Sequence, residues 1–343
     1  MSDYTGIVAL LEVDDLRTQF FGREGRVHAV DGVSFAVDAG RTLGIVGESG
    51  CGKSVTALSI MRLLPARQAA IVGGTVRFDG RELTRLGRRE LEDLRGREIA
   101  MIFQDPMTSL NPTLSIGAQI VETLRRHLRL GRDAARRRAV EILEEVEIPD
   151  ARRRLDDYPH NYSGGMRQRV MIAIATACRP KLLIADEPTT ALDVTVQASV
   201  LDLLHDLQAE HGMGLVLITH DMGVIAEMAD EVVVMYAGQV VEQAPALELF
   251  DRPEHPYTEA LLAALPQIDV AGVRRRRLAA IQGRPPSLLE PPATCRFAPR
   301  CVYASADDGC ASAMPELRAI RPSHLVRTTH PRSERGALAE VTG

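Results

Sequence analysis

The chain has 343 residues, enough for one large or two modest domains, and its 45% apolar content excludes a disordered or fibrous chain. The 41 basic and 46 acidic residues give a net charge of −5, so binding to nucleic acid is disfavoured as the main activity. The apolar runs are too short to cross a bilayer, and no signal peptide precedes them, so we expect a chain without a membrane segment.

The first chemical motif is a glycine-rich loop. Only two of the 41 basic residues are lysines, Lys53 and Lys181, so a lysine in a motif has a chemical reason to be there. Lys53 belongs to a run that fits the phosphate-loop pattern G-x-x-x-x-G-K-[ST]. That run is Gly47, Glu48, Ser49, Gly50, Cys51, Gly52, Lys53 and Ser54. It follows a strand-like stretch at 42–46 and precedes a helical stretch that ends before Pro65, which is the context a phosphate loop requires.

The loop suits a nucleoside triphosphate. Glycines let successive backbone N–H groups point inward, and the helix that begins near Lys53 adds its positive N-terminal end. Lys53 then reaches the β and γ phosphates, and the Ser54 hydroxyl is a ligand for Mg²⁺. The alternative is a glycine-rich turn before a helix, without a ligand.

Three further apolar runs, at 99–103, 182–185 and 215–219, end in polar residues and predict buried parallel strands. Ligands of open α/β sheets lie beyond the carboxyl ends of such strands. The polar residues that follow these runs are Gln104, Asp186, Glu187 and His220. Each has a plain alternative, since a lone histidine is more often structural and an Asp-Glu pair before proline is usually a turn.

Together these residues suit phosphoryl transfer to water. Asp186 is expected to hold Mg²⁺ through water, and Glu187 to accept a proton from the attacking water or to polarise it. Gln104 is expected to contact the metal and that water. His220 is expected to bind the γ-phosphate and to position the nucleophile.

A second anion site is predicted at Ser163, Gly164 and Gly165, which open a helix expected from Met166 to about Cys178. Ser-Gly-Gly is also an ordinary helix cap and turn. Because one chain does not need two phosphate sites for one nucleotide, we interpret this site as binding the nucleotide held by another chain.

The order of these motifs, with Asp193 in Ala191-Leu192-Asp193, resembles that of an ABC-transporter ATPase subunit over roughly residues 8 to 250. The resemblance implies an α/β fold of the ABC-type P-loop NTPase class, with a RecA-like parallel core sheet, an N-terminal antiparallel β-region and a helical subdomain. It implies two ATPase domains that face head to tail with ATP between them, Asp193 at the seam, and a membrane subunit near Gln104. By offset, Phe20 is the candidate to stack on adenine, with Phe21 close by and a core role equally open.

The same comparison divides the chain into an ATPase domain at 1–250, with a helical subdomain at about 107–165, and an appended segment at 251–343. Hairpins are predicted at Asp79-Gly80 and between Glu231 and Glu242, turning at Gly238. The arginines at 136–138 are interpreted as a solvated helix face rather than a nucleic-acid patch.

The appended segment resembles the C-terminal extension of oligopeptide and dipeptide importer ATPases, through His255-Pro256-Tyr257-Thr258, Gly283-Arg284-Pro285-Pro286 and the stretch from Cys295 to Cys301. Met107-Thr108-Ser109-Leu110-Asn111-Pro112 matches the same group. The resemblance implies an ATP-hydrolysing subunit, peripheral on the cytoplasmic face of the membrane, that drives peptide import. Its implied partners are a second ATPase subunit, two membrane permease subunits and an extracytoplasmic solute-binding protein. Two different ATPase subunits commonly pair in this group, and an identical partner stays open. A nickel or glutathione importer, or a soluble ABC ATPase, remains as an alternative.

The five cysteines are too few for a disulfide framework, but three of them cluster as Cys295, Cys301 and Cys310. Some members of the group that the chain resembles carry four cysteines here, suited to an iron–sulfur cluster. This chain has Thr328 in the fourth place. His324 or His330 as a substitute ligand, a three-iron cluster, and packed thiols without metal all stay open.

Overall fold

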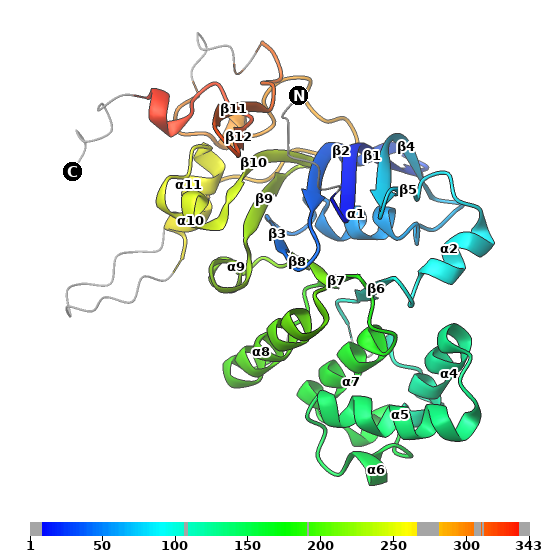
Figure 1. The fold of residues 1–343 in the computed structure, drawn as a ribbon. Helices are drawn as coiled ribbons and strands as arrows, with labels where there is room; N and C mark the ends of the chain where they lie inside the picture. The colour runs from blue at the N-terminus through cyan, green and yellow to red at the C-terminus, as the bar shows by residue number, and fades with distance from the viewer. Residues whose placement is uncertain are drawn as a thin grey trace, which may run out of the picture. The chain divides into compact units, whose positions relative to one another are not determined.

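The computed structural model describes residues 9–105, 109–190, 192–265, 281–304, 310 and 312–335. Met107, Thr108, Ala191 and the arginine run at 274–277 lie outside the described residues. The chain forms two compact units, each assembled from separate stretches of sequence (Figure 1). Among the described residues, the first unit contains those of Met1–Glu12, Ala36–Thr42 and Val76–Ile218, and the second those of Val13–Phe35, Leu43–Thr75 and Thr219–Gly343.

The first unit has a parallel sheet in which β7 (Leu182–Asp186) lies between β6 (Ile99–Ile102) and β8 (Gly214–Ile218). Every residue of these three strands is buried, as is usual for a parallel sheet that is covered on both faces. The predicted buried parallel strands are therefore confirmed, with bounds shifted by a residue or two.

Among the helices of the first unit, α4 (Ile116–Leu128) buries one face. Ile116, Ile120 and Leu124 recur at helical spacing along α4 and are fully buried. Across the described residues, every helix falls short of the length and apolar character that a bilayer-spanning segment needs. The helical elements are α2 (Arg88–Leu94), α4 (Ile116–Leu128), α5 (Arg132–Glu145), α6 (Ala151–Arg154), η1 (Pro159–Asn161), α7 (Gly164–Thr176) and α8 (Val194–His211).

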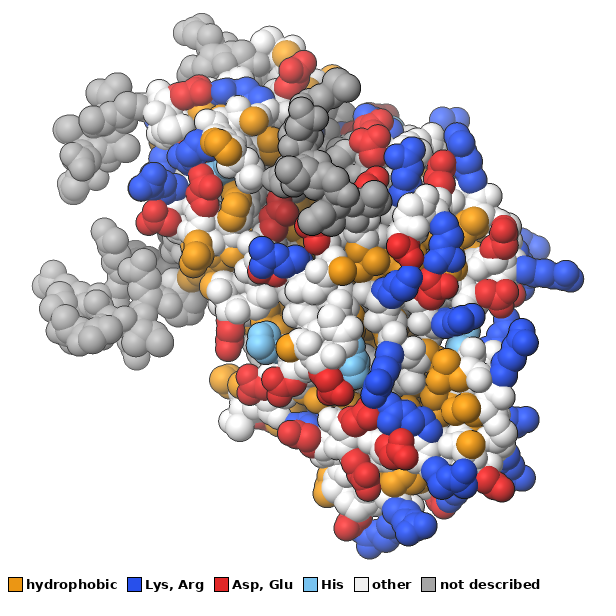
Figure 2. Space-filling model, in the orientation of Figure 1, with side chains coloured by type: hydrophobic (Ala, Val, Ile, Leu, Met, Phe, Trp, Pro, Cys, Tyr) orange, Lys and Arg blue, Asp and Glu red, His pale blue; other side chains and the backbone are white. Residues whose placement is uncertain are grey.

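The arginines of α5 lie on a solvated face. Arg136 pairs with Asp156 at 2.6 Å, and Arg138 pairs with Glu145 at 2.8 Å. Figure 2 shows basic and acidic side chains intermingled over this helical part of the chain. Neighbouring carboxylates therefore offset the charge of these arginines, in keeping with their interpretation as a solvated face.

An antiparallel region is formed by the early strands. The strands β1 (Leu11–Gly22), β2 (Gly25–Val37) and β4 (Ala69–Phe78) share a sheet in the order β2-β1-β4. β4 then turns at Asp79 and Gly80 into β5 (Arg81–Glu82), with which it pairs antiparallel. Both turn residues have positive φ, 48° and 73°, which a two-residue hairpin turn of this kind requires. The predicted hairpin is confirmed.

In the second unit, β3 (Thr42–Val46) runs parallel to β9 (Glu231–Tyr236), which pairs antiparallel with β10 (Gln239–Pro245). The turn between β9 and β10 consists of Ala237 and Gly238, with φ of 45° and 84°. This confirms the second predicted hairpin. The helices of this unit are α1 (Lys53–Ile60), α9 (Met222–Met228), α10 (Ala246–Asp251) and α11 (Pro256–Ala263).

The segment after residue 250 extends the sheet of the second unit. β12 (His324–Val326) pairs antiparallel with β10, and β11 (Arg318–Arg321) pairs with β12. Two short turns of 3₁₀ helix, η2 (Ala298–Arg300) and η3 (Arg332–Glu334), complete it. The sequence predicts an appended element here but none of these strands, and the boundary at residue 250 stays a prediction.

Candidate nucleotide-binding site

The glycine-rich loop joins β3 to α1 in a conformation that only glycine adopts without strain. Gly47 and Gly52 have φ of 150° and 110°. A Cβ on Gly47 would lie 2.2 Å from the carbonyl oxygen of Met235, and one on Gly52 would lie 2.4 Å from that of Ala29. The loop is therefore packed against the backbone of β9 and β2, and its glycines permit this close approach.

Lys53 is the first residue of α1, and its side chain folds back over the loop. Its Nζ atom donates to the carbonyl oxygens of Gly47 at 2.7 Å and Glu48 at 3.2 Å, and the residue is only 5% exposed. Ser54 follows as the second residue of α1. The structure thus places the predicted lysine and serine at the positive end of a helix, where a phosphate binds most favourably.

The two predicted carboxylates follow each other at the end of β7. Asp186 is buried, and Glu187 has a φ of 48° and donates its backbone N–H to the carbonyl of Ile218 at 2.8 Å. Glu187 Oε2 accepts hydrogen bonds from Gln104 Nε2 at 3.1 Å and from Thr190 Oγ1 at 2.7 Å. The first unit therefore brings Gln104 and Glu187 together, as the sequence predicts.

Thr190 is a site residue that the sequence reasoning missed. Its hydroxyl donates to the same oxygen of Glu187 that Gln104 contacts, so two donors orient this carboxylate. The spacing of three residues after Glu187 is the signal that could have revealed it, because the chain turns there: the N–H of Thr190 also donates to the carbonyl of Glu187 at 3.2 Å.

His220 belongs to the same unit as the glycine-rich loop. The preceding residue, Thr219, donates its N–H to the carbonyl of Ile45 in β3 at 3.2 Å, and the next residue, Asp221, caps α9. The His220 side chain is exposed. His220 thus directly follows Thr219, whose backbone is hydrogen-bonded to β3.

The Ser163 motif opens a helix, as predicted, although the helix begins at Gly164 rather than Met166. Ser163 Oγ accepts from the N–H of Met166 at 3.3 Å and caps α7, while Asp193 Oδ1 caps α8 by accepting from Val196 at 3.0 Å. A Cβ on Gly165 would lie 2.6 Å from Val196 Cγ1, so the two helix starts are neighbours in the first unit. Ser163 and Gly164 are exposed, which leaves this helix end accessible.

Phe20 and Phe21 both lie on β1 in the second unit. Phe20 is half-buried, and Phe21 is 42% exposed. Since neighbouring strand residues point to opposite faces, only one of the two can face a bound base. The stacking role of Phe20 stays a prediction.

Among the described residues, the structure shows no metal site at the three clustered cysteines. Cys295 and Cys310 are buried, and Cys310 Sγ lies 2.8 Å from the hydroxyl of Thr329. Burial raises the pKa of the Cys295 and Cys301 thiols. Within the described ranges, no group of three or more His, Cys, Asp or Glu side chains is arranged to hold a metal ion. The iron–sulfur cluster, one of the alternatives left open by the sequence, is therefore not supported, and we derive no chemistry from one.

His324, considered above as a substitute metal ligand, instead contacts two glutamates. It is fully buried, with Nε2 2.8 Å from Glu242 Oε1 and Nδ1 3.1 Å from Glu248 Oε1. Burial alone would lower the pKa of His324, but the hydrogen bonds and charges of the two glutamates raise it above its ordinary value. The raised pKa favours the protonated ring, which ties β12 to β10 and α10 through these two contacts.

Because the pKa of His324 is raised by folding, its stabilising effect is complete below the unfolded pKa of about 6.5 and is lost as pH rises through the folded value. We expect His324→Gln to lower the free energy of unfolding by about 3 kcal/mol at about pH 6, and by clearly less at about pH 9. Urea denaturation at both pH values measures this. His205→Gln, at a side chain that is 65% exposed, is the control, and a loss for His324→Gln that is equal at both pH values would contradict the charged ring.

Two protein families match this chain. Residues 30–190 match the ABC transporter family, and residues 241–310 match the family described as "Oligopeptide/dipeptide transporter, C-terminal region". Among solved structures, the chain is similar to the dimeric ATP-binding cassette MJ0796 in a post-hydrolysis state bound to ADP and Pi. That likeness has a TM-score of 0.62 at 28% identity and covers 69% of this chain and 98% of the other. It is also similar to cbiO1 from Clostridium perfringens, part of the ABC transporter complex cbiONQ, with a TM-score of 0.59 at 28% identity over 71% of this chain and 91% of the other.

The similarity to curated relatives extends over nearly the whole chain. The probable peptide ABC transporter ATP-binding protein y4tR of Sinorhizobium fredii is 54% identical over 92% of this chain and 93% of its own length. The oligopeptide transport ATP-binding protein OppD is 49% identical in Bacillus subtilis, over 95% of this chain and 90% of the relative. The OppD of Salmonella typhimurium is 50% identical over 92% of both.

The glycine-rich loop and the parallel strands define an ATP-hydrolysing enzyme of the ABC cassette class, which confirms the predicted fold. More closely, the chain belongs to the ATP-binding subunits of ABC transporters of the oligopeptide and dipeptide type.

Proposed function

We propose that this chain is the ATPase subunit that powers the import of peptides across the cytoplasmic membrane, bound to its inner face. The observation that carries the proposal is the match of residues 241–310 to the oligopeptide/dipeptide transporter C-terminal family, in a chain about half identical to peptide-transport ATPases along most of its length. A nickel or glutathione importer is the second candidate, because the predicted motifs do not separate these solutes.

The proposed chemistry is hydrolysis of Mg-ATP. The backbone N–H groups of residues 47–54 and the Lys53 ammonium would bind the phosphates, and Ser54, Gln104 and Asp186 would hold Mg²⁺. The metal would neutralise charge that develops on the phosphates. Glu187 would accept a proton from the attacking water, with its carboxylate oriented by the hydrogen bonds from Gln104 and Thr190. His220 would position that water against the γ-phosphate.

One proposed partner, a second ATPase subunit, is supported by the exposed helix start at Ser163. The N-terminus of α7 is a favourable anion site, and we propose that it caps the ATP held by a second ATPase subunit. Asp193, which caps the neighbouring helix α8, would lie at that seam. Two membrane permease subunits and an extracytoplasmic solute-binding protein would complete the transporter.

Peptide uptake by cells tests the function. The gene is disrupted, and uptake of a radiolabelled pentapeptide and of ⁶³Ni²⁺ is measured, with complementation by wild type, Glu187→Gln and Glu92→Gln. We expect peptide uptake to be lost on disruption and restored by wild type and by Glu92→Gln, which changes only an exposed carboxylate paired with Arg88. Unchanged peptide uptake with lost nickel uptake would contradict the proposal and favour the second candidate.

A bulky residue at Gly164 is expected to silence the ATP site of the partner subunit. A Cβ at Gly164 meets only Leu192 Cδ2, at 4.0 Å, so Gly164→Leu should fold normally while it blocks the exposed end of α7. We expect ATP hydrolysis at the partner site to fall at least about tenfold, as when a donor to a transition-state oxyanion is removed. Phosphate release by the assembled ATPase pair measures this. The control is Gly131→Leu at the start of α5, where a Cβ meets nothing within 4 Å; equal activity of the two variants would contradict the proposal.

A further inference from the structure

The glycine-rich loop is held by side chains that come from more than 200 residues further along the chain. Its residue Glu48 is contacted at the carboxylate by Arg300 and at the backbone N–H by Tyr257. All three residues belong to the second unit. The carbonyl of Glu48 in turn accepts a hydrogen bond from Lys53 Nζ at 3.2 Å. The segment after residue 250 thus contacts Glu48, which in turn contacts the predicted phosphate-binding residue Lys53.

Arg300 binds Glu48 in a two-pronged ion pair. Its Nη1 and Nη2 atoms lie 2.7 Å and 2.9 Å from the two carboxylate oxygens, and its side chain is only 4% exposed. The guanidinium also donates to the carbonyl of Gln282 at 2.9 Å and to the hydroxyl of Tyr236 at 3.2 Å. Because several acceptors fix the guanidinium plane, the pair can hold Glu48 in one position, which a flexible surface pair cannot.

Tyr257 holds the other side of Glu48. Its hydroxyl accepts the backbone N–H of Glu48 at 2.8 Å, and its ring is fully buried. The ring packs against Tyr236 and Phe297, with centroids 4.7 Å and 5.4 Å away. Packing on two aromatic neighbours leaves the hydroxyl little freedom, so this support of the loop is rigid.

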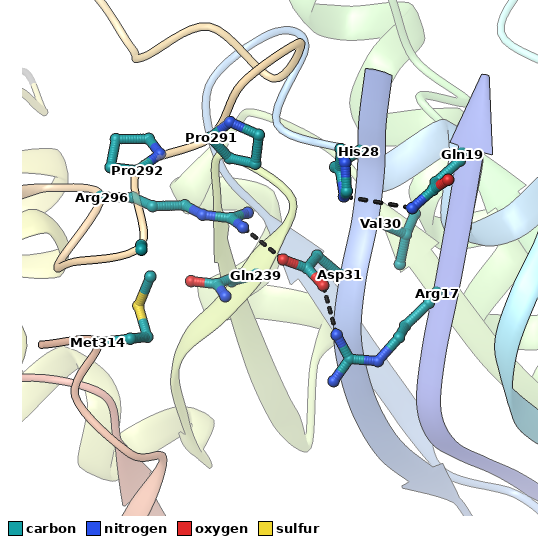
Figure 3. A pocket seen from close by; sticks show the side chains of 11 residues that line it. Arg17, Gln19, His28, Val30, Asp31, Gln239, Pro291, Pro292, Arg296 and Met314 are labelled. Atoms are coloured by element: carbon teal, nitrogen blue, oxygen red, sulfur yellow. Dashed lines mark hydrogen bonds and ion pairs between the residues drawn. The ribbon is translucent and has the colours of Figure 1, made fainter. Parts of the chain in front are cut away.

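Arg296, four residues before Arg300, supports the loop by a second route, through the β9–β10 turn. Arg296 donates to the carbonyl of Ala237 at 2.5 Å and pairs with Asp31, and Figure 3 shows its guanidinium directed at Asp31 from the side opposite Arg17. The residue after Ala237, Gly238, donates its N–H to the carbonyl of Cys51 in the loop at 2.8 Å. Arg296 therefore fixes the β9–β10 turn, which contacts the loop at Cys51. Cys51 lies four residues after Gly47, whose carbonyl accepts the hydrogen bond from Lys53.

We propose that Arg300 and Tyr257 are positioning residues for ATP binding, through which the C-terminal segment keeps the phosphate loop in its binding shape. The inference rests on the proposed role of the loop in binding ATP. Without these contacts, the carbonyl and N–H of Glu48 are no longer held in place. Ordering the loop on binding then costs free energy, and ATP binds more weakly. The consequence falls on ATP affinity, because neither side chain takes part in the chemical step.

The experiment measures the Kd of Mg-ATP by fluorescent-nucleotide displacement, and KM and kcat by phosphate release, on the full chain. We expect Arg300→Ala to raise Kd and KM by about tenfold, equivalent to about 1.4 kcal/mol, with kcat changed by less than about twofold. Arg300→Lys, which keeps the charge but loses the fork, should recover part of the affinity. Tyr257→Phe keeps the ring and should raise Kd by about threefold.

Glu48→Gln provides a second route that leaves every other contact of Arg300 in place. It should weaken ATP binding, and the double variant should lose less affinity than the product of the two single losses, because both changes remove the same Arg300–Glu48 ion pair. Arg318→Ala is the control, since it breaks an exposed ion pair in the same segment, in which Arg318 Nη2 contacts both carboxylate oxygens of Glu334. We expect wild-type affinity for this control.

Two results would overturn the inference. One is an unchanged Kd for both Arg300→Ala and Glu48→Gln with a lowered melting temperature, which would make the pair a purely structural contact. The other is a double variant whose loss equals the product of the single losses. A wild-type chain that binds no ATP would instead overturn the role of the loop itself, and with it this inference, so the two failures are distinguishable.

Discussion

Glu187→Gln is expected to reduce ATP hydrolysis at least about 100-fold while leaving ATP binding intact. A general base contributes a factor of this order, and the amide cannot take a proton from water. We expect the geometry of the site to be preserved in the variant, because the carbonyl oxygen of glutamine can accept the hydrogen bonds from Gln104 and Thr190 that Glu187 Oε2 accepts. Phosphate release and nucleotide displacement on the same preparation measure the two quantities.

The control for this variant is Glu92→Gln, which removes an exposed carboxylate paired with Arg88 on α2. It should hydrolyse ATP at the wild-type rate. Wild-type turnover by Glu187→Gln would reject Glu187 as the base. A loss of ATP binding in the same variant would show that the carboxylate holds the nucleotide rather than the water.

Lys53→Ala is expected to abolish detectable hydrolysis and to weaken Mg-ATP binding by about 10- to 100-fold. The substitution removes the charge that would contact the phosphates, and charge-assisted hydrogen bonds contribute about 1.5–3 kcal/mol each. It also leaves the carbonyls of Gly47 and Glu48 without the donor that holds the loop closed. The Kd of Mg-ATP and the melting temperature, measured together, separate these two effects.

The chain offers a matched control in its only other lysine. Lys181→Ala breaks a surface pair with Asp79 at 2.6 Å, where the lysine side chain is 53% exposed. Its ATP affinity should stay at the wild-type value. If Lys53→Ala bound Mg-ATP as tightly as Lys181→Ala, the phosphate contact assigned to Lys53 would be wrong.

The sequence predicts those parts of the fold that depend on local pattern. The runs of buried Leu, Ile and Val become β3, β6, β7 and β8, and the helix α1 begins at Lys53 as the phosphate-loop pattern requires. The turn residues Asp79-Gly80 and Ala237-Gly238 adopt the positive φ angles that a tight hairpin requires. In each case the determining residues are adjacent in sequence, so pattern alone suffices.

The start of α7 shows the limit of this reasoning. Glycines weaken a helix, so the sequence favours a start at Met166, yet the helix begins at Gly164. The Ser163 side chain caps it there, and Gly165 packs too closely on Val196 for any larger residue. Tertiary packing and capping outweigh the intrinsic propensity.

Local sequence pattern does not predict contacts between residues that are far apart in the sequence. Arg300 and Glu48 are 252 residues apart, and Tyr257 and Glu48 are 209 apart, with nothing in their local sequence to pair them. The same holds for His324 and Glu242. The sequence leaves His324 as a candidate metal ligand, whereas the fold places it between the carboxylates of Glu242 and Glu248. The pairing of β10 with β12 brings His324 to Glu242.

The central claim is that one ATP is held by the phosphate loop of one ATPase subunit and by the Ser163 helix of another. Size-exclusion chromatography with light scattering on Glu187→Gln, alone and co-expressed with its companion ATPase subunit, tests this most directly. With Mg-ATP the account predicts a particle of two ATPase subunits that separates when nucleotide is removed or when Gly164 is replaced by leucine. A chain that binds Mg-ATP and yet remains a monomer in both preparations would contradict it.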